Sequence, residues 1–213
     1  MTTTTTTTTR TTLTTLTKLD DPARWHRVLC PVGDRLIVTG DLDADTARAL
    51  DQLGDWVDAG VTAIVDVRGE WSDEALVAAN APGLDYIWAG THDGGFAQSD
   101  GWFDAVLARL RPHLDDPTGV VLTHCHMGVN RGPSMALRIL LELGWDALDA
   151  LEAIRAARPI AATIYAADAV DHFHRRQGSS TTVRVADVRR VARWLETHPI
   201  DVAWIVSRIR RAA

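Results

Sequence analysis

The stretch VVLTHCHMGVNRGPSMALRILLEL, residues 120–143, decides the fold. Its first part, Val120 to Thr123, is a short Val-rich run typical of a buried strand, and Met135 to Leu143 has the spacing of a helix. The loop between them contains a glycine and ends at Arg131. A strand, a tight loop and a helix in this order form an anion cradle, because the loop N–H groups and the helix N-terminus point at one spot.

Strands and helices alternate on both sides of this stretch. Upstream, apolar runs predict strands at residues 35–39, 61–67 and 86–88, and helical spacing predicts helices at 45–59, 72–79 and 101–113. Downstream, further helices are expected at 146–157, 163–176, 185–197 and 200–211. The pattern predicts an α/β domain with a mostly parallel central sheet flanked by helices, followed by extra C-terminal helices. Ligands of such sheets bind beyond the carboxyl ends of the strands, where Cys125 falls.

Length and composition suit one domain of ordinary size, and the residues at its two ends differ from it in composition. The Thr-rich residues 1–18 have no core-forming period and are expected to be disordered, residues 19–178 form the domain, and 179–213 form a helical extension. No apolar run approaches the roughly 18 residues of a spanning helix, and the N-terminus lacks the apolar stretch of a signal peptide.

Residues 184–213 carry seven arginines and three acids. A solvated helix face explains this better than an anionic partner site.

Charge and cysteine content limit the partners and the compartment. The net charge of −6 argues against nucleic acid as the main partner. Two cysteines, Cys30 and Cys125, cannot form a disulfide framework. A reactive Cys125 favours a reducing compartment, which for this chain predicts the cytoplasm, because an oxidised nucleophile is inactive.

Cys125 and Arg131 carry the chemistry. A cysteine at the base of an anion cradle feels partial positive charge, which favours its thiolate. The planar guanidinium of Arg131 suits two phosphate oxygens. Because the dipole makes a helix N-terminus a poor place for a cation, the placement of Arg131 there favours a functional role. Together they indicate a phosphate ester attacked by sulfur. The alternative, an inert buried thiol, fits Cys30 better than Cys125, because only Cys125 is followed by a glycine-bearing loop, an arginine and a helix start.

The cradle itself comprises the five residues between the cysteine and the arginine, namely His126, Met127, Gly128, Val129 and Asn130. Gly128 lets the loop adopt a backbone that other residues resist. Gly132 and Pro133 open the helix, and Ser134 lies in its first turn, where it either caps the helix or assists the loop.

His124 and His126 flank the cysteine, which raises the question of a metal site. Alternating side chains on an extended segment point to opposite faces, and no distant cluster completes a ligand set, so neither a metal nor a cofactor is expected. We expect His124 behind the loop, bonded to backbone or sulfur, and His126 at the rim of the pocket.

A leaving alkoxide needs a proton, so the chain should contain a general acid. Asp93, among glycines that allow its loop to close, is favoured over Asp100, which could cap the next helix, and over the solvated Asp104. Asp66 and Arg68 end a buried strand at the same edge. They form either a structural pair or a brace for the catalytic loop, and the sequence leaves both open.

Cys125, five residues and Arg131, preceded by His124 and including Gly128, resemble the signature of the cysteine-dependent protein tyrosine phosphatases, in particular the compact dual-specificity group. Asp93, which precedes Cys125 by 32 positions, fits the general-acid loop of that group. The segment 37–42 is similar to its first strand, and 147–160 to the segment after its active-site helix. The resemblance covers about residues 30–178.

The resemblance implies a two-step reaction without metal or cofactor, in which Cys125 attacks phosphorus while Asp93 protonates the leaving oxygen and later activates water. This chain departs from the family at Gly132, where Ser or Thr usually eases release of the thiolate. We therefore expect slower breakdown of the phosphoenzyme, unless Ser134 substitutes in part. No lysine lies inside the loop, which disfavours a phosphoinositide. A phosphoprotein is the first choice of substrate and a small phosphate ester the second.

Two other classes of function remain open. A pseudophosphatase would bind phosphopeptides without turnover, and only Gly132 favours it. A rhodanese-like sulfur carrier also uses a loop cysteine, but Asp93 would have no role there.

Overall fold

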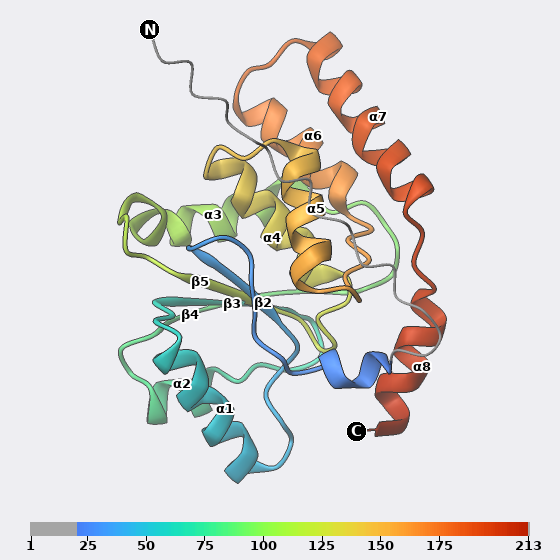
Figure 1. Cartoon of the computed structure of the whole chain (residues 1–213). Helices are drawn as coiled ribbons and strands as arrows, with labels where there is room; N and C mark the ends of the chain where they lie inside the picture. The colour runs from blue at the N-terminus through green and yellow to red at the C-terminus, as the bar shows by residue number, and fades with distance from the viewer. Residues whose placement is uncertain (1–20, 213) are drawn as a thin grey trace, which may run out of the picture.

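A five-stranded sheet runs through the middle of the protein in the order β1-β2-β5-β3-β4 (Figure 1). The computed structural model describes residues 21–212. The strands are β1 (Cys30–Pro31), β2 (Leu36–Thr39), β3 (Ala63–Arg68), β4 (Asp85–Thr91) and β5 (Val121–His124). All neighbouring pairs are parallel except β1 with β2. The prediction of a mostly parallel α/β sheet is therefore confirmed.

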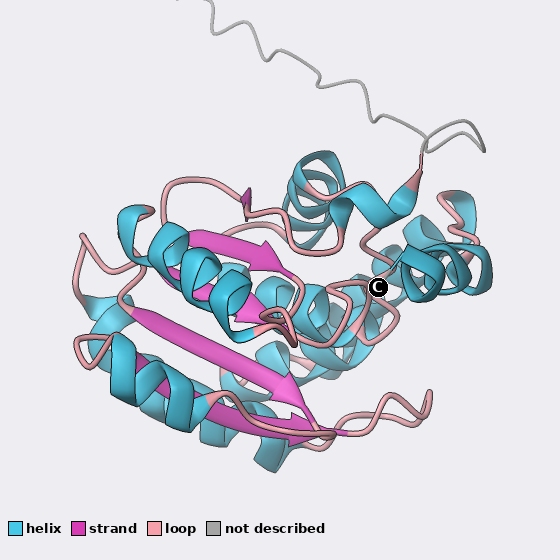
Figure 2. Ribbon diagram, turned by 90° about the horizontal axis from the view of Figure 1, so that it is seen from below, coloured by secondary structure: helices cyan, strands magenta, loops and turns pink. Residues whose placement is uncertain are grey.

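Helices cover both faces of the sheet (Figures 1 and 2). One face carries α1 (Thr46–Asp58) and α2 (Glu74–Asn80), and the other carries α3 (Asp100–Asp115), α4 (Arg131–Glu142), α5 (Ala147–Ala157) and α6 (Ala166–Arg176). Side chains alternate along β2, so that Leu36 and Val38 face α4 while Ile37 joins the core beneath α1. Since both faces are buried, every residue of β3 and β5 is buried, and each strand begins with consecutive rather than alternating apolar residues.

Local signals place most helix ends. Asp45 and Asp146 accept hydrogen bonds from the first turns of α1 and α5, as expected of N-caps. The expectation that Asp100 caps the next helix is wrong, because Ser99 is the cap of α3. The turn η1 (Pro22–Trp25) and the two-residue β1 were not predicted, since so short a segment has no periodicity.

The last two helices, α7 (Thr181–Thr197) and α8 (Val202–Ala212), contact different parts of the domain. α7 contributes Val191 and Trp194 to the main core. α8 lies beside η1 and packs with the loop after β5. The prediction for residues 1–18 lies outside the described residues. Between residues 21 and 212, no helix has the length and apolar character needed to cross a bilayer.

Candidate active site

The loop between β5 and α4 lies at the carboxyl edge of the sheet, flanked by the parallel strands β2 and β3. Cys125 follows the last residue of β5 directly, and its side chain is 3% exposed. α4 begins at Arg131, one residue before Gly132, which was predicted to open the helix, so the loop leads directly into the helix N-terminus. The unpaired N–H groups of the first turn of α4 are therefore close to the cysteine in the chain, and a helix N-terminus of this kind favours an anion.

A buried arginine fixes the back of this loop. Gly128 has φ +60°, and a Cβ there would collide with the Thr39 carbonyl and the guanidinium of Arg158. Arg158, wholly buried, donates to the carbonyls of Gly128 at 2.6 Å, Met127 at 3.0 Å and His26 at 3.0 Å. One rigid fork thus holds His26 and the Met127–Gly128 segment together, although they lie far apart in the chain.

Replacing Arg158 by Met is expected to destabilise the protein by about 3 kcal/mol, because it leaves several buried carbonyls without a donor. Urea unfolding of the Arg158→Met variant measures this. Arg111→Met is the matched control, since Arg111 is a 60% exposed ion-pair residue and its loss should change stability by no more than about 0.5 kcal/mol. Equal stability of the two variants would contradict the role assigned to Arg158.

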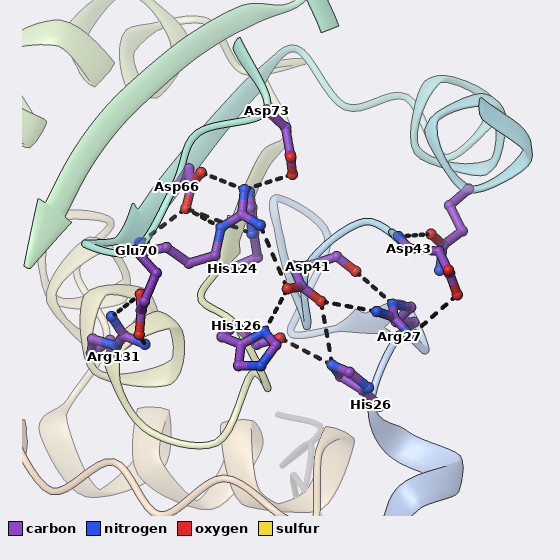
Figure 3. A network of polar contacts seen from close by, with 12 residues as sticks. His26, Arg27, Asp41, Asp43, Asp66, Glu70, Asp73, His124, His126 and Arg131 are labelled. Carbon is purple, nitrogen blue, oxygen red and sulfur yellow. Dashed lines mark hydrogen bonds and ion pairs between the residues drawn. The ribbon is translucent and has the colours of Figure 1, made fainter. Parts of the chain in front are cut away.

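Arg131 is clamped by a glutamate that the sequence did not single out. Its Nη1 and Nη2 donate to the two carboxylate oxygens of Glu70 at 2.8 Å each, and Nη1 also donates to the Thr91 carbonyl at 2.8 Å (Figure 3). Burial alone would lower the pKa of Arg131, but Glu70 and the nearby Cys125 raise it. The same hydrogen bonds lower the pKa of Glu70. The buried Nε has no hydrogen-bond partner within residues 21–212, so it can donate to a ligand oxygen.

Asp93 is held over the cavity by two donors to one of its oxygens. Oδ1 accepts from Asn130 Nδ2 at 2.6 Å and from the Tyr165 hydroxyl at 2.9 Å, while Oδ2 lies 3.7 Å from Arg131 Nε. Tyr165 also accepts from the Gly95 amide at 3.1 Å, which ties the Asp93 loop to the start of α6. Burial, helped by Asp93, raises the pKa of Tyr165, so its hydroxyl keeps its proton and donates.

The two flanking histidines lie on opposite sides of the loop. His124 is completely buried 3.9 Å from Asp66, and burial lowers its pKa. The expected hydrogen bond of His124 to backbone or sulfur is absent, because neither ring nitrogen has a partner among the described residues. His126 lies 35% exposed at the rim, where its Nδ1 bonds Asp41 Oδ2 at 2.6 Å (Figure 3).

His26, Asp41 and His126 offer the one group of possible metal ligands found within residues 21–212, with ligand atoms within 4.8 Å of one another. Two guanidinium groups already lie close to the carboxylate of Asp41. Arg27 Nη2 lies 3.5 Å from Oδ1 and Arg68 Nη1 lies 3.5 Å from Oδ2. Burial works to raise the pKa of Asp41, but His126 and His26 together hold it far below its usual range. The two arginine charges disfavour a cation there.

Asp66 and Arg68 combine both of the roles that the sequence left open. Arg68 Nη2 donates to Asp66 Oδ2 at 2.7 Å, and both side chains are fully buried. Because Arg68 also contacts Asp41, which bonds His126, the pair is connected to the β5–α4 loop. Burial alone would lower the pKa of Arg68, but Asp66 and Asp73 raise it.

The remaining candidates lie around the first turn of α4 and at α3. A Cβ at Gly132 would lie 3.1 Å from the Cys125 amide nitrogen, so the helix start approaches the end of β5 closely. Ser134 Oγ, fully buried, accepts from the Tyr165 amide at 3.3 Å. Asp100, 47% exposed, pairs with Arg175 and does not line the cavity.

Cys125, Arg131 and Asp93 line one cavity of about 300 Å³. Its lining comprises residues of the β3–α2 and β4–α3 loops, the β5–α4 loop, the segment before α6 and the helix α8: Glu70, Asp93, Cys125, His126, Met127, Val129, Asn130, Arg131, Ile164, Val202, Val206 and Arg210. Sequence reasoning missed Glu70, Tyr165 and Arg158. Only Arg158 carried a signal, because it precedes Pro159 in the segment already similar to the family.

Sequence comparison matches the chain to no protein-family model and to no curated protein. Structure comparison finds solved phosphatase structures instead. Human DUSP28 is 18% identical and covers 72% of this chain and 100% of its own, with a TM-score of 0.57. PTPMT1 is 17% identical over 75% of this chain and 99% of its own, with a TM-score of 0.56.

A human tyrosine phosphatase-like serine/threonine/tyrosine-interacting protein is 14% identical and covers 70% of this chain and 95% of its own, with a TM-score of 0.52. These likenesses confirm the predicted fold. The chain has the α/β fold of the cysteine-dependent protein tyrosine phosphatases of the dual-specificity type.

Proposed function

We propose that this chain is a cysteine-dependent phosphatase that hydrolyses phosphate monoesters, with phosphoproteins as its first substrate class. The observation that carries the proposal is the convergence of Cys125, Arg131 and Asp93 on one cavity at the carboxyl edge of the sheet. Cys125 and Arg131 stand at the two ends of the β5–α4 loop and Asp93 lies in the β4–α3 loop, and each has the chemistry that one part of the reaction needs.

In the first step, the Cys125 thiolate attacks phosphorus, a sulfur–phosphorus bond forms and the bond to the leaving oxygen breaks. Asp93 supplies the proton to that oxygen. Asn130 and Tyr165 both donate to Oδ1, so the acid proton resides on Oδ2. The loop amides and the Arg131 Nε hold the phosphoryl oxygens as charge develops.

In the second step, water attacks the cysteinyl phosphate while Asp93, now ionised, accepts a proton from the water. The sulfur–phosphorus bond breaks, and inorganic phosphate and the thiolate are released. Glu70 keeps the Arg131 fork aligned throughout, because a bidentate pair fixes the plane of a guanidinium.

Hydrolysis of p-nitrophenyl phosphate from mildly acidic to neutral pH, with a chelator present, tests the proposal. We expect turnover that the chelator does not reduce. The fold is shared with a protein named phosphatase-like, so the assay decides between an enzyme and a binding module. Tungstate binding without turnover would favour the phosphopeptide-binding alternative. Transfer of sulfur from thiosulfate would favour the sulfur carrier, in which the orientation of Asp93 has no purpose.

Gly132→Ser is expected to speed phosphoenzyme breakdown about tenfold, since a hydroxyl beside Cys125 can donate to the departing thiolate. The size of the pre-steady-state burst of nitrophenol measures this. Gly132→Ala is the matched control, because its Cβ meets the same backbone 3.1 Å away but carries no hydroxyl. Identical breakdown rates in the two variants would show that the serine hydroxyl does not assist release of the thiolate.

We also propose that the protein works in the cytoplasm. Cys30 and Cys125 are both free thiols, and a reducing compartment keeps a nucleophilic cysteine active. Reversible loss of activity on peroxide treatment, restored by a thiol, is the expected behaviour of the purified protein.

A further inference from the structure

The C-terminal helix α8 forms one wall of the cavity that holds Cys125. Ile205 and Ile209 are buried against Met127 and Val129 of the catalytic loop. The neighbouring face of α8 lines the cavity through Val202, Val206 and Arg210. The helix end is therefore fixed relative to the phosphate site by packing with the loop itself.

The two arginines that line the cavity differ in their partners. Arg131 is bound through both terminal nitrogens to Glu70, so much of its charge is already offset. Arg210 has no ion pair within residues 21–212, whereas Arg208, one half-turn away on α8, pairs with Asp21 at 3.4 Å. Arg210 is thus the cation of the lining that remains available to a ligand.

We propose that Arg210 forms a second anion subsite beside the phosphate-binding loop. The inference deepens the proposed function and rests on it. The substrate would be a phosphate ester whose alcohol portion carries a second phosphate or a carboxylate within the length of the cavity. The phosphoryl group to be cleaved would contact Cys125 and Arg131, and the second anion would contact the guanidinium of Arg210.

The chemistry of the cavity supports this division. Ile164, Val202 and Val206 line the same cavity as Arg131 and Arg210, so the body of the substrate would meet apolar side chains. A charge pair inside a cavity is screened less by water than one on an open surface. A guanidinium is suited to phosphate and carboxylate because its parallel N–H groups match two oxygens.

Binding to the inactive Cys125→Ser variant tests the subsite without turnover. The probes are propyl phosphate and propanediol bisphosphate with its phosphates on the two end carbons, measured by calorimetry. We expect the bisphosphate to bind about tenfold more tightly, beyond the statistical advantage of having two phosphates. Adding Arg210→Gln should remove that preference. Adding Arg211→Gln should not, because Arg211 carries the same charge on the same helix but does not line the cavity.

Two results would overturn the inference. Equal weakening of both probes by Arg210→Gln would assign Arg210 to the phosphate that is cleaved. Equal effects of Arg210→Gln and Arg211→Gln would reduce the preference to overall charge. Failure of the proposed function is a separate result. If the wild-type protein prefers the bisphosphate but hydrolyses no aryl phosphate, the anion subsite is supported and the phosphatase activity is contradicted.

The source of the second anion is distinguished by repeating the measurement with phosphotyrosine peptides flanked on both sides by Glu or by Gln. A preference that depends on Arg210 supports the subsite, whether it is for the bisphosphate over propyl phosphate or for the Glu-flanked over the Gln-flanked peptide. A larger preference in the first pair indicates a second phosphate, and a larger one in the second pair indicates a carboxylate. No such preference in either pair overturns the inference.

Discussion

Cys125→Ser should lower the rate of p-nitrophenyl phosphate hydrolysis by at least about a thousandfold. A serine hydroxyl at this position stays protonated at neutral pH and is a poor nucleophile. The substitution is nearly isosteric, and the amides of the loop and Arg131 do not depend on the sulfur. Binding of tungstate should therefore persist, which separates loss of chemistry from loss of the site.

Cys30→Ser is the control for Cys125→Ser. Cys30 is also buried, at 2% exposed, but it lies in β1 and does not line the cavity. Its replacement should leave hydrolysis within about twofold of wild type, as is usual for a conservative change away from the chemistry. Equal losses in both variants would indicate a general effect of removing thiols, and persistent activity of Cys125→Ser would exclude Cys125 as the nucleophile.

Arg131→Lys should lower kcat/KM on the order of a thousandfold although the charge is kept. An ammonium group cannot span Glu70, the Thr91 carbonyl and a phosphoryl oxygen as the guanidinium does. It offers no donor in the place of Nε, the nitrogen nearest Asp93. The loss should be seen in kcat as well as in KM, because the fork stabilises charge that develops during the reaction.

Glu70→Gln provides the graded comparison for Arg131→Lys. The amide retains one acceptor for Arg131 but not the charge or the second acceptor, so we expect a smaller loss of about tenfold. Activity of Arg131→Lys within tenfold of wild type would show that charge suffices and would contradict the proposed role of the fork.

The strand–loop–helix core of the fold was predictable because it is encoded locally. The Val-rich run before Cys125 and the caps Asp45 and Asp146 each act within a few residues, and the structure has each of them in place. Helix starts were less accurate. α7 begins at Thr181 rather than at 185, and α6 begins at Ala166 rather than at 163 because Thr163 has φ +55°, which no local pattern indicates.

The supporting contacts of the site were not predictable, because their partners are distant in the chain. Glu70 meets Arg131 across 61 positions and Tyr165 meets Asp93 across 72. Arg158 reaches the carbonyl of His26 across 132 positions. Each residue type is common on protein surfaces, and only the tertiary fold gives it a partner. The nucleophile, the arginine and the acid were visible because the chemistry restricts their type and spacing.

The most direct test of the account is to trap the phosphoenzyme. Asp93→Asn should still form it from p-nitrophenyl phosphate, since nitrophenolate leaves without a proton, but should hydrolyse it slowly because the amide cannot activate water. We would quench this variant with acid after mixing and locate the phosphoryl group by peptide mass spectrometry. The account predicts one phosphoryl group on Cys125 and none on Cys30. A phosphoryl group elsewhere, or turnover of the variant at the wild-type rate with none on Cys125, would contradict it.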